Sequence, residues 1–312
     1  MLVIIICALT HVTSLPNHKI LEFSNFISFF LTSSRMKELT NDQAPVVNGE
    51  EFREWILYED DDLISLSKPG WLVCHPSKNG PMSSLVGATK KYLQVDTIHL
   101  VSRLDRETSG VVLFAKHRKS ASYWQKGVEC KSVKRGYLAI LNGVMQKQES
   151  IDGYIGNDPM SKVFVKQKIT RKSRNSKFAE TTFIPLINGK NQTLCLVLTA
   201  TGRKHQIRVH AHGLGFSLVG DKLYGPDEDY YLKFCETGWM DEWFSSLGMS
   251  RQALHSRWLM DLNSGQLFTA PFPQDMKDFI EINFKVCVPD IKQVLSNADE
   301  HFIKEIEAFK VM

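Results

Sequence analysis

Short stretches of apolar residues, separated by charged or glycine-containing turns, run through most of the chain. Residues 63–67, 111–115 and 136–141 have the length and composition of buried strands. β-Branched residues and alternating patterns predict further strands at residues 163–169, 177–187, 193–199 and 251–262. A Pro-Gly pair follows the first strand, so residues 71–74 are predicted to form its hairpin partner or a bent continuation.

Other segments carry apolar residues at helical spacing. Residues 119–129, 204–212 and 275–284 are predicted helices with one apolar face. Residues 290–309 have the same period and predict a helical tail at the end of the chain. Because strands dominate and helices are few, we expect an α+β domain with a mixed, largely antiparallel sheet and flanking helices.

The amino terminus departs from this pattern. Residues 2–9 resemble the apolar part of a signal peptide, but no Lys or Arg precedes them and the run is far shorter than the roughly 20 residues of a membrane helix. Residues 20–31 are apolar without a clear period, so we expect the functional chain to begin near Met36. The predicted organisation is a poorly ordered extension, a folded domain and a terminal helix, at residues 1–50, 51–288 and 289–312.

Composition narrows the class of protein. Of 312 residues, 43% are apolar and 23% charged, which is typical of a globular enzyme and excludes a disordered or membrane chain. The net charge of +4 is too small to indicate nucleic-acid binding by itself, so local clustering of cations matters more. The six cysteines include no CxxC pair, which argues against structural zinc, and a chain of this size needs no disulfide framework. We therefore expect reduced thiols and a cytoplasmic protein.

The most distinctive polar segment, residues 102–110, has the sequence Ser-Arg-Leu-Asp-Arg-Glu-Thr-Ser-Gly. Asp105 lies between Arg103 and Arg106, two cations that can hold its carboxylate ionised, and the following Thr-Ser-Gly can fix the loop backbone. These are the properties of a carboxylate nucleophile. A charged turn in which Asp105 bonds to its own backbone accounts for the same residues, and this segment alone leaves both open.

Three further motifs favour the first interpretation. They are Lys-Pro-Gly-Trp-Leu-Val-Cys-His-Pro at residues 68–76, Lys-Arg-Gly-Tyr-Leu-Ala at 134–139 and Gly-Arg-Lys-His-Gln-Ile-Arg-Val-His at 202–210. In this order, together with the Asp105 segment, they resemble the RluA-type pseudouridine synthases over roughly residues 57–276. The resemblance implies that the folded domain is a pseudouridine synthase catalytic domain. Too few residues precede it to form the separate RNA-binding module that some relatives carry.

The implied reaction breaks the N-glycosidic bond of a uridine in RNA, turns the base and rejoins it to the same sugar through carbon 5. It needs no cofactor and no metal. The resemblance assigns the nucleophile to Asp105, the guanidinium that pairs with it to Arg208, and a ring that stacks on the base and can take the carbon-5 proton to Tyr137. It leaves open whether Asp105 attacks the sugar or assists elimination. Helical spacing alone favours a surface Arg208, and the strand pattern allows a core Tyr137 on the same side as Ala139 and Leu141.

Other residues are expected to contact RNA. Arg103 matches the side chain that enters the helix stack in place of the extruded nucleotide, whose extrusion costs about a few kcal/mol. The family usually has His where Ser102 stands and Thr where Lys204 stands, so details of RNA entry differ here. The other predicted substrate-binding residues are Arg106, Arg203, His205, Gln206, Lys166, Lys168 and Arg171.

Two clusters of polar residues remain. Residues 162–177 hold seven cations and no acid, which predicts a phosphate-facing strand and loop, although a solvated hairpin tip has the same composition. His205, His210 and His212 invite a metal interpretation, but no carboxylate accompanies them in the manner of a His-Glu-x-x-His site, so we predict no metal.

Together these observations predict a monomeric RNA pseudouridine synthase that acts on structured RNA, either transfer or ribosomal, and has no membrane partner. The alternative on the same fold is a protein that binds RNA without turnover, but binding alone needs no buried carboxylate. A glycoside hydrolase would require a second acid, and Glu107, two residues from Asp105, is the nearby one. The sequence does not identify the RNA or the uridine.

Overall fold

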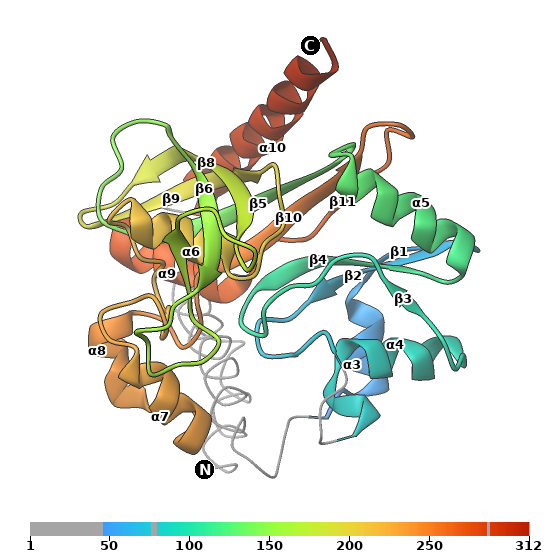
Figure 1. The fold of residues 1–312 in the computed structure, drawn as a ribbon, viewed down its shortest axis with the longest axis horizontal. Helices are drawn as coiled ribbons and strands as arrows, with labels where there is room; N and C mark the ends of the chain where they lie inside the picture. Colours follow the sequence, from blue (N-terminus) through green and yellow to red (C-terminus); the bar gives the residue numbers. More distant parts are fainter. Residues whose placement is uncertain (1–45, 76–79, 286–287, 312) are drawn as a thin grey trace, which may run out of the picture.

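The computed structural model describes residues 46–75, 80–285 and 288–311 (Figure 1). Our predictions for residues 1–45, including the start near Met36, lie outside this part. The helices are α3 (Gly49–Glu54), α4 (Leu85–Leu93), α5 (Arg118–Glu129), α6 (Gln206–Gly213), α7 (Asp229–Thr237), α8 (Phe244–Leu247), α9 (Gln274–Phe284) and α10 (Val288–Val311), with 3₁₀ turns at η2 (Pro81–Ser83) and η3 (Asp241–Trp243). The strands are β1 (Ile56–Glu59), β2 (Leu63–Lys68), β3 (His99–Leu100), β4 (Ser109–Ala115), β5 (Val133–Asn142), β6 (Glu149–Asn157), β7 (Gln167–Thr170), β8 (Lys177–Asn188), β9 (Gln192–Thr199), β10 (Leu254–Asp261) and β11 (Leu267–Thr269).

These strands form one 11-stranded sheet in the order β1-β2-β4-β10-β5-β9-β8-β6-β7, to which β3 adds beside β4 and β11 beside β10. Neighbouring strands are antiparallel except β4 and β10, which are parallel. The predicted α+β class with a mixed, largely antiparallel sheet is therefore confirmed.

The parallel pairing of β4 and β10 requires a glycine. Ser256 on β10 pairs with Gly110 on β4, and Gly110 has a φ of +113°. A Cβ at this position would lie 2.1 Å from the Ser256 carbonyl oxygen. Only glycine therefore allows the loop that carries Asp105 to enter the sheet here.

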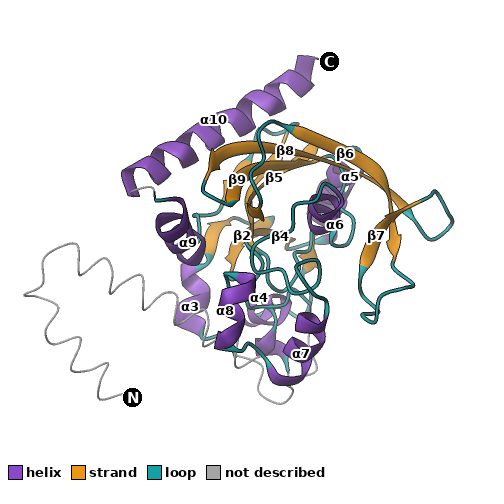
Figure 2. Ribbon diagram, turned by 90° about the vertical axis from the view of Figure 1, so that its left-hand side faces the viewer, coloured by secondary structure: helices purple, strands orange, loops and turns teal. Residues whose placement is uncertain are grey.

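Helices cover both faces of the curved half of the sheet. Figure 2 shows α10 along the outer face and α6 inside the curve. On β8, Thr181 faces inward and its hydroxyl bonds to His210 of α6 (2.9 Å), whereas Ile184, of opposite parity, joins the cluster that contains Phe302 of α10. This alternation follows the strand period of two and places α6, which carries Arg208, on the inner face of the sheet.

The other half of the sheet is supported by a separate core. Phe52 of α3, Leu85 of α4, Phe234 of α7 and Leu247 of α8 belong to one buried cluster, together with Leu66 of β2. This cluster anchors helices from distant parts of the sequence below β2 and β4 (Figure 2). None of the described helices is long and apolar enough to cross a membrane.

One predicted strand is wrong, and a second is confirmed only in its last residues. Residues 71–74 form a turn whose Val73 and Cys74 carbonyls accept hydrogen bonds from Leu85 and Val86 at the start of α4, so they are unavailable to a hairpin. The strand predicted at 163–169 begins only at Gln167, because the preceding loop is bonded to α7. Strand β6 was not predicted, since its glycines and charged residues interrupt the alternation.

Candidate active site

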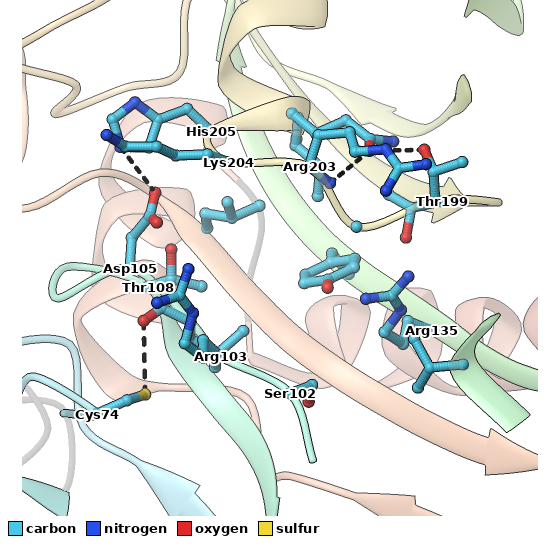
Figure 3. Close-up of a pocket in the computed structure, with 18 of the residues that line it drawn as sticks. Cys74, Ser102, Arg103, Asp105, Thr108, Arg135, Thr199, Arg203, Lys204 and His205 are labelled. Atoms are coloured by element: carbon cyan, nitrogen blue, oxygen red, sulfur yellow. Dashed lines mark hydrogen bonds and ion pairs between the residues drawn. The ribbon is translucent and has the colours of Figure 1, made fainter. Parts of the chain in front are cut away.

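The predicted catalytic residues meet in one cleft. A cavity of about 910 Å³ is lined by the Asp105 loop, by β5 and by the segment from Thr199 to Arg208 (Figure 3). Asp105, Tyr137 and Arg208 all line it, although they come from a loop, a strand and a helix that are far apart in the sequence.

Asp105 contacts two basic side chains. Its Oδ2 atom accepts a hydrogen bond from Arg208 Nη1 (3.1 Å) and lies 4.0 Å from His205 Nε2, while about a third (32%) of the side chain is exposed to the cleft. Burial favours the neutral acid, but His205 and Arg208 outweigh it and hold the pKa of Asp105 below its ordinary value. Burial also lowers the pKa of His205 to about 4, so its imidazole is neutral near pH 7. The permanent charge of Arg208 therefore keeps Asp105 ionised.

Arg208 is held by a second carboxylate that sequence analysis missed. Asp221 accepts hydrogen bonds from Arg208 Nε (2.7 Å) and Nη2 (2.8 Å), and also from the backbone amides of Leu223 (2.9 Å) and Tyr224 (3.0 Å). Its side chain is fully buried. Burial works against its ionisation, but Arg208 and the two amides keep the pKa of Asp221 low. Two donors of the guanidinium are thus fixed, which leaves Nη1 directed at Asp105.

Tyr224 contacts both His205 and Arg208. The Tyr224 hydroxyl accepts from the Gln167 amide (2.9 Å) and lies 2.9 Å from His205 Nδ1, while the ring faces the Arg208 guanidinium at 4.9 Å. Since the amide uses the hydroxyl as an acceptor, the hydroxyl hydrogen is available to Nδ1. When the hydroxyl donates to Nδ1, the neutral imidazole carries its hydrogen on Nε2, the nitrogen that lies 4.0 Å from Asp105 Oδ2.

The helix predicted at 204–212 begins at Gln206, since His205 has a left-handed φ of 55°. Gln206 is buried and its amide is fully used within the protein: Oε1 accepts from Thr201 Oγ1 (2.7 Å) and the Arg203 amide (3.0 Å). Nε2 donates to the Glu180 carbonyl (2.8 Å) and Thr181 Oγ1 (2.9 Å). These four bonds exhaust its donors and acceptors, so Gln206 holds the turn that carries Arg203.

Tyr137 satisfies both interpretations of its strand position. It is 8% exposed and belongs to the same cluster as Ala139 and Leu141, but its side chain also forms part of the cleft wall. The ring is therefore rigidly packed on one side and accessible to a ligand on the other.

Arginines surround the mouth of the cleft. Arg103, Arg106 and Arg203 are exposed and line it, and none of them forms an ion pair with a carboxylate in the described part of the chain. Arg103 Nη1 lies 2.7 Å from His75 Nε2, and Arg203 Nε donates to the Phe178 carbonyl (2.8 Å). Burial and the charge of Arg103 lower the pKa of His75, so its neutral ring serves as the acceptor. Figure 3 shows Arg103 and Arg203 on different walls of the cleft.

Buried cations support the catalytic loop from below. Lys68 Nζ donates to the Arg106 carbonyl and to two carbonyls of its own turn, each at 2.8 Å, and burial lowers its pKa to about 7. Lys222 Nζ binds both carboxylate oxygens of Glu107 (3.0 Å), and Arg251 Nη1 donates to the Glu107 carbonyl (3.2 Å). Because Glu107 is already bonded to Lys222, it is not placed as the proton donor of a glycoside hydrolase.

The basic segment at 162–177 does not line the cleft. Lys166 is paired with Glu228 (2.8 Å) and Lys168 with Asp158 (3.2 Å), while Arg171 lies in the exposed turn between β7 and β8. The structure thus separates these three predicted substrate-binding residues from the cleft. Within the described ranges, no group of three or more His, Cys, Asp or Glu residues could hold a metal ion.

Comparison with known proteins identifies the family. The family model described as RNA pseudouridylate synthase matches residues 62–212. An uncharacterised RNA pseudouridine synthase of Bacillus subtilis, YjbO, is 34% identical over 235 residues, which are 72% of this chain and 75% of the relative. The chain belongs to the RNA pseudouridylate synthase family.

Two further comparisons agree with this family. Ribosomal large subunit pseudouridine synthase D of Nitrosomonas europaea is 32% identical, over 72% of this chain and 64% of that protein. The human RNA pseudouridylate synthase domain containing 4 has the same fold, with a TM-score of 0.57 at 23% identity over 75% of this chain and 94% of that one. The predicted RluA-type family and the enzyme class, an RNA pseudouridine synthase and thus an isomerase, are confirmed.

Proposed function

We propose that this pseudouridine synthase isomerises specific uridines in structured RNA and that Asp105 is its nucleophile. The observation that carries the proposal is the single hydrogen bond from Arg208 to Asp105 Oδ2, made by a guanidinium whose other donors are fixed by Asp221. Arg208 keeps the carboxylate ionised while the part exposed to the cleft can reach a substrate. Relatives named for the ribosomal large subunit favour ribosomal over transfer RNA.

The reaction is an isomerisation, so every atom of the product comes from the same nucleotide and no oxidant or reductant is needed. The carboxylate of Asp105 promotes cleavage of the bond between N1 and the sugar, either by attack on the sugar carbon or by elimination, and the electron pair stays with the base. The detached uracil turns against the ring of Tyr137. Carbon 5 then bonds to the sugar carbon, which releases the Asp105 carboxylate in the attack route, or restores to the sugar the proton that was removed in the elimination route. A base then takes the carbon-5 proton, and the phenol of Tyr137 lines the cleft where this base is needed. N1 ends with a proton.

The arginines at the cleft mouth contact the RNA that surrounds the target uridine. Arg103 projects from the Asp105 loop into solvent and is oriented by His75, so it can fill the space left by an extruded nucleotide. Arg106 and Arg203 line the cleft and are exposed, which supports a role in contacting RNA phosphates. We further propose a cytoplasmic, monomeric enzyme that works without a cofactor.

Asp105→Asn provides the test, because it removes the charge and keeps the shape. Purified wild-type protein and the variant are incubated with total RNA from cells that lack the protein, and new pseudouridines are mapped at single-nucleotide resolution. We expect discrete sites with the wild type and none above background with Asp105→Asn. Equal product from both would refute the nucleophile. RNA binding by the wild type without any new pseudouridine would instead favour the protein that binds without turnover.

A further inference from the structure

The structure divides the basic segment at 162–177 into two parts that differ in charge neutralisation. The first, which we call the docked lysines, consists of Lys162, Lys166 and Lys168. The second, which we call the distal turn, consists of Arg171, Lys172, Arg174 and Lys177. All seven are equivalent in the sequence, where no acid separates them.

Each of the docked lysines is paired with a carboxylate. Lys162 pairs with Asp229 (3.1 Å), Lys166 with Glu228 (2.8 Å) and Lys168 with Asp158 (3.2 Å). Glu228 also accepts from Ser161 Oγ (2.7 Å) and the Lys162 amide (3.0 Å), and the bonds from Lys166 and Ser161 lower its pKa to about 2. These contacts fasten the loop before β7 to the start of α7, so the docked lysines stabilise local structure.

The cations of the distal turn are arranged differently. All four are exposed, and none forms an ion pair within the described residues. Ser176 Oγ donates to the Arg171 carbonyl (3.2 Å) and accepts from the Ser173 amide (2.7 Å), so the turn is held in shape without using its charges. A preorganised, unneutralised cluster of cations suits a polyanion, since little ordering is left to be lost on binding.

Two aromatic rings lie beside the distal turn. Tyr154 of β6 and Phe178 of β8 are directly opposite in the antiparallel register, with ring centroids 5.7 Å apart, and the Lys172 amine is 6.0 Å from the Tyr154 ring. Phe178 is 39% exposed. Cations interleaved with exposed aromatic rings are typical of surfaces that bind unpaired nucleotides.

The distal turn is connected to the cleft. The carbonyl of Phe178 accepts a hydrogen bond from Arg203 Nε (2.8 Å), and Arg203 lines the cleft together with Lys204. Within the described residues, neither Arg203 nor Lys204 has a carboxylate partner. The Arg203 side chain therefore links the cleft mouth to the start of β8, which directly follows the distal turn.

We propose that the distal turn, with Phe178 and Tyr154, is a second RNA-contacting surface that holds the phosphates of a strand leaving the cleft, and that the docked lysines do not contact RNA. The proposal rests on the proposed function in that RNA occupies the cleft. It corrects the prediction that Lys166 and Lys168 bind substrate and keeps the prediction for Arg171.

Two charge-neutralising variants of the full chain compare the parts. The distal variant is Arg171→Gln, Lys172→Gln, Arg174→Gln and Lys177→Gln, and the docked variant is Lys162→Gln, Lys166→Gln and Lys168→Gln. Affinity for an unmodified RNA stem-loop with a uridine-containing loop is measured over a range of salt concentrations. Because each phosphate contact contributes about 0.7 to 0.9 to the slope of log K against log salt, the distal variant should lose about three units of slope. The docked variant should keep the wild-type slope.

Thermal unfolding supplies the matched control. The distal variant should unfold at the wild-type temperature, because its side chains have no carboxylate partners in the described structure, and the docked variant at a lower temperature, because Glu228 loses its partner. Phe178→Leu keeps apolar bulk without an aromatic face, and it should weaken binding roughly 5-fold or more, whereas Phe178→Tyr should retain it.

The outcomes separate the two proposals. A distal variant with the wild-type slope, or a docked variant with an equal loss of slope, overturns the second surface even if the wild type forms pseudouridine. If Phe178→Leu binds RNA with wild-type affinity, the aromatic ring does not contribute to this surface. A wild type that forms no pseudouridine, with the slopes differing as expected, overturns the catalytic function and leaves the RNA surface standing.

Discussion

Two sets of cations surround the catalytic loop, and their environments are opposite. Below the loop lie Lys68, Lys222 and Arg251, each about 1% exposed and each bonded to a carbonyl or carboxylate of the protein. Above it lie Arg103 and Arg106, which are exposed at the cleft mouth. The two sets are separated by little more than the thickness of the loop.

The difference shows how one residue type performs two tasks. A buried charge loses its hydration and is tolerated only when hydrogen bonds replace the lost water, so the lower set is committed to holding the loop backbone. The upper set keeps its hydration and can exchange water for phosphate. The lower cations therefore determine where Asp105 lies, and the upper ones determine what approaches it.

Lys222→Met should have the largest effect, because it leaves the Glu107 carboxylate without its ammonium partner in a site where that carboxylate is only 12% exposed. Loss of one member of a buried pair typically destabilises a protein by about 3–5 kcal/mol. Chemical denaturation measures the change in unfolding free energy. The double variant Lys222→Met, Glu107→Gln should recover part of the loss. A decrease below about 1 kcal/mol, within the range of surface ion pairs, would place Lys222 with the upper set instead.

Asp221→Asn tests the link between the buried network and Asp105, the proposed nucleophile. Arg208 would lose a charged, bidentate acceptor, and hydrogen bonds to charged groups contribute about 1.5–3 kcal/mol. If Arg208 then points less accurately at Asp105, kcat should fall roughly 10- to 150-fold with little change in KM for RNA. Single-turnover and steady-state measurements separate the two constants. An equal rise in KM without a change in kcat would mean that Asp221 supports binding only.

Arg106→Gln should have the smallest effect, because it removes one exposed charge. The slope of log K against log salt for RNA binding should decrease by about 0.7 to 0.9, with unfolding free energy unchanged. Arg118→Gln is the matched control, since Arg118 is exposed at the start of α5 and does not line the cleft. The same slope for both variants would show that Arg106 does not contact a phosphate.

Much of the fold could be predicted because continuous apolar runs are local signals. The run at 111–115 corresponds to β4 and the run at 136–141 to β5, each extended by a few residues in the structure. Strand β6 has no such signal, because charged and glycine residues interrupt its apolar positions and only the consecutive Ile155 and Gly156 are buried. It is defined by its pairing with β8 and β7, which is a tertiary property.

The candidate site also contains residues that could be predicted from the sequence and residues that could not. Asp105, Tyr137 and Arg208 could be singled out because each lies in a distinctive short motif. The roles of Asp221, Lys222 and Arg251 could not, because their partners lie 13, 115 and 144 residues away along the chain. Arg251 and Arg106 are the same residue type in the sequence, and only the folded structure shows which of them is buried.

Strand β10 lies between β4, which follows the Asp105 loop, and β5, which carries Tyr137. On one edge Ser256 pairs with Gly110, just beyond the loop of Asp105, and on the other edge it pairs with Tyr137. The backbones of Gly110, where the Asp105 loop enters β4, and of Tyr137 are thus kept two interstrand spacings apart, about 9.5 Å. If Asp105 and Tyr137 act on one base as proposed, an insertion in β10 would leave both side chains chemically intact and still abolish activity, because it would change the width of the gap between them.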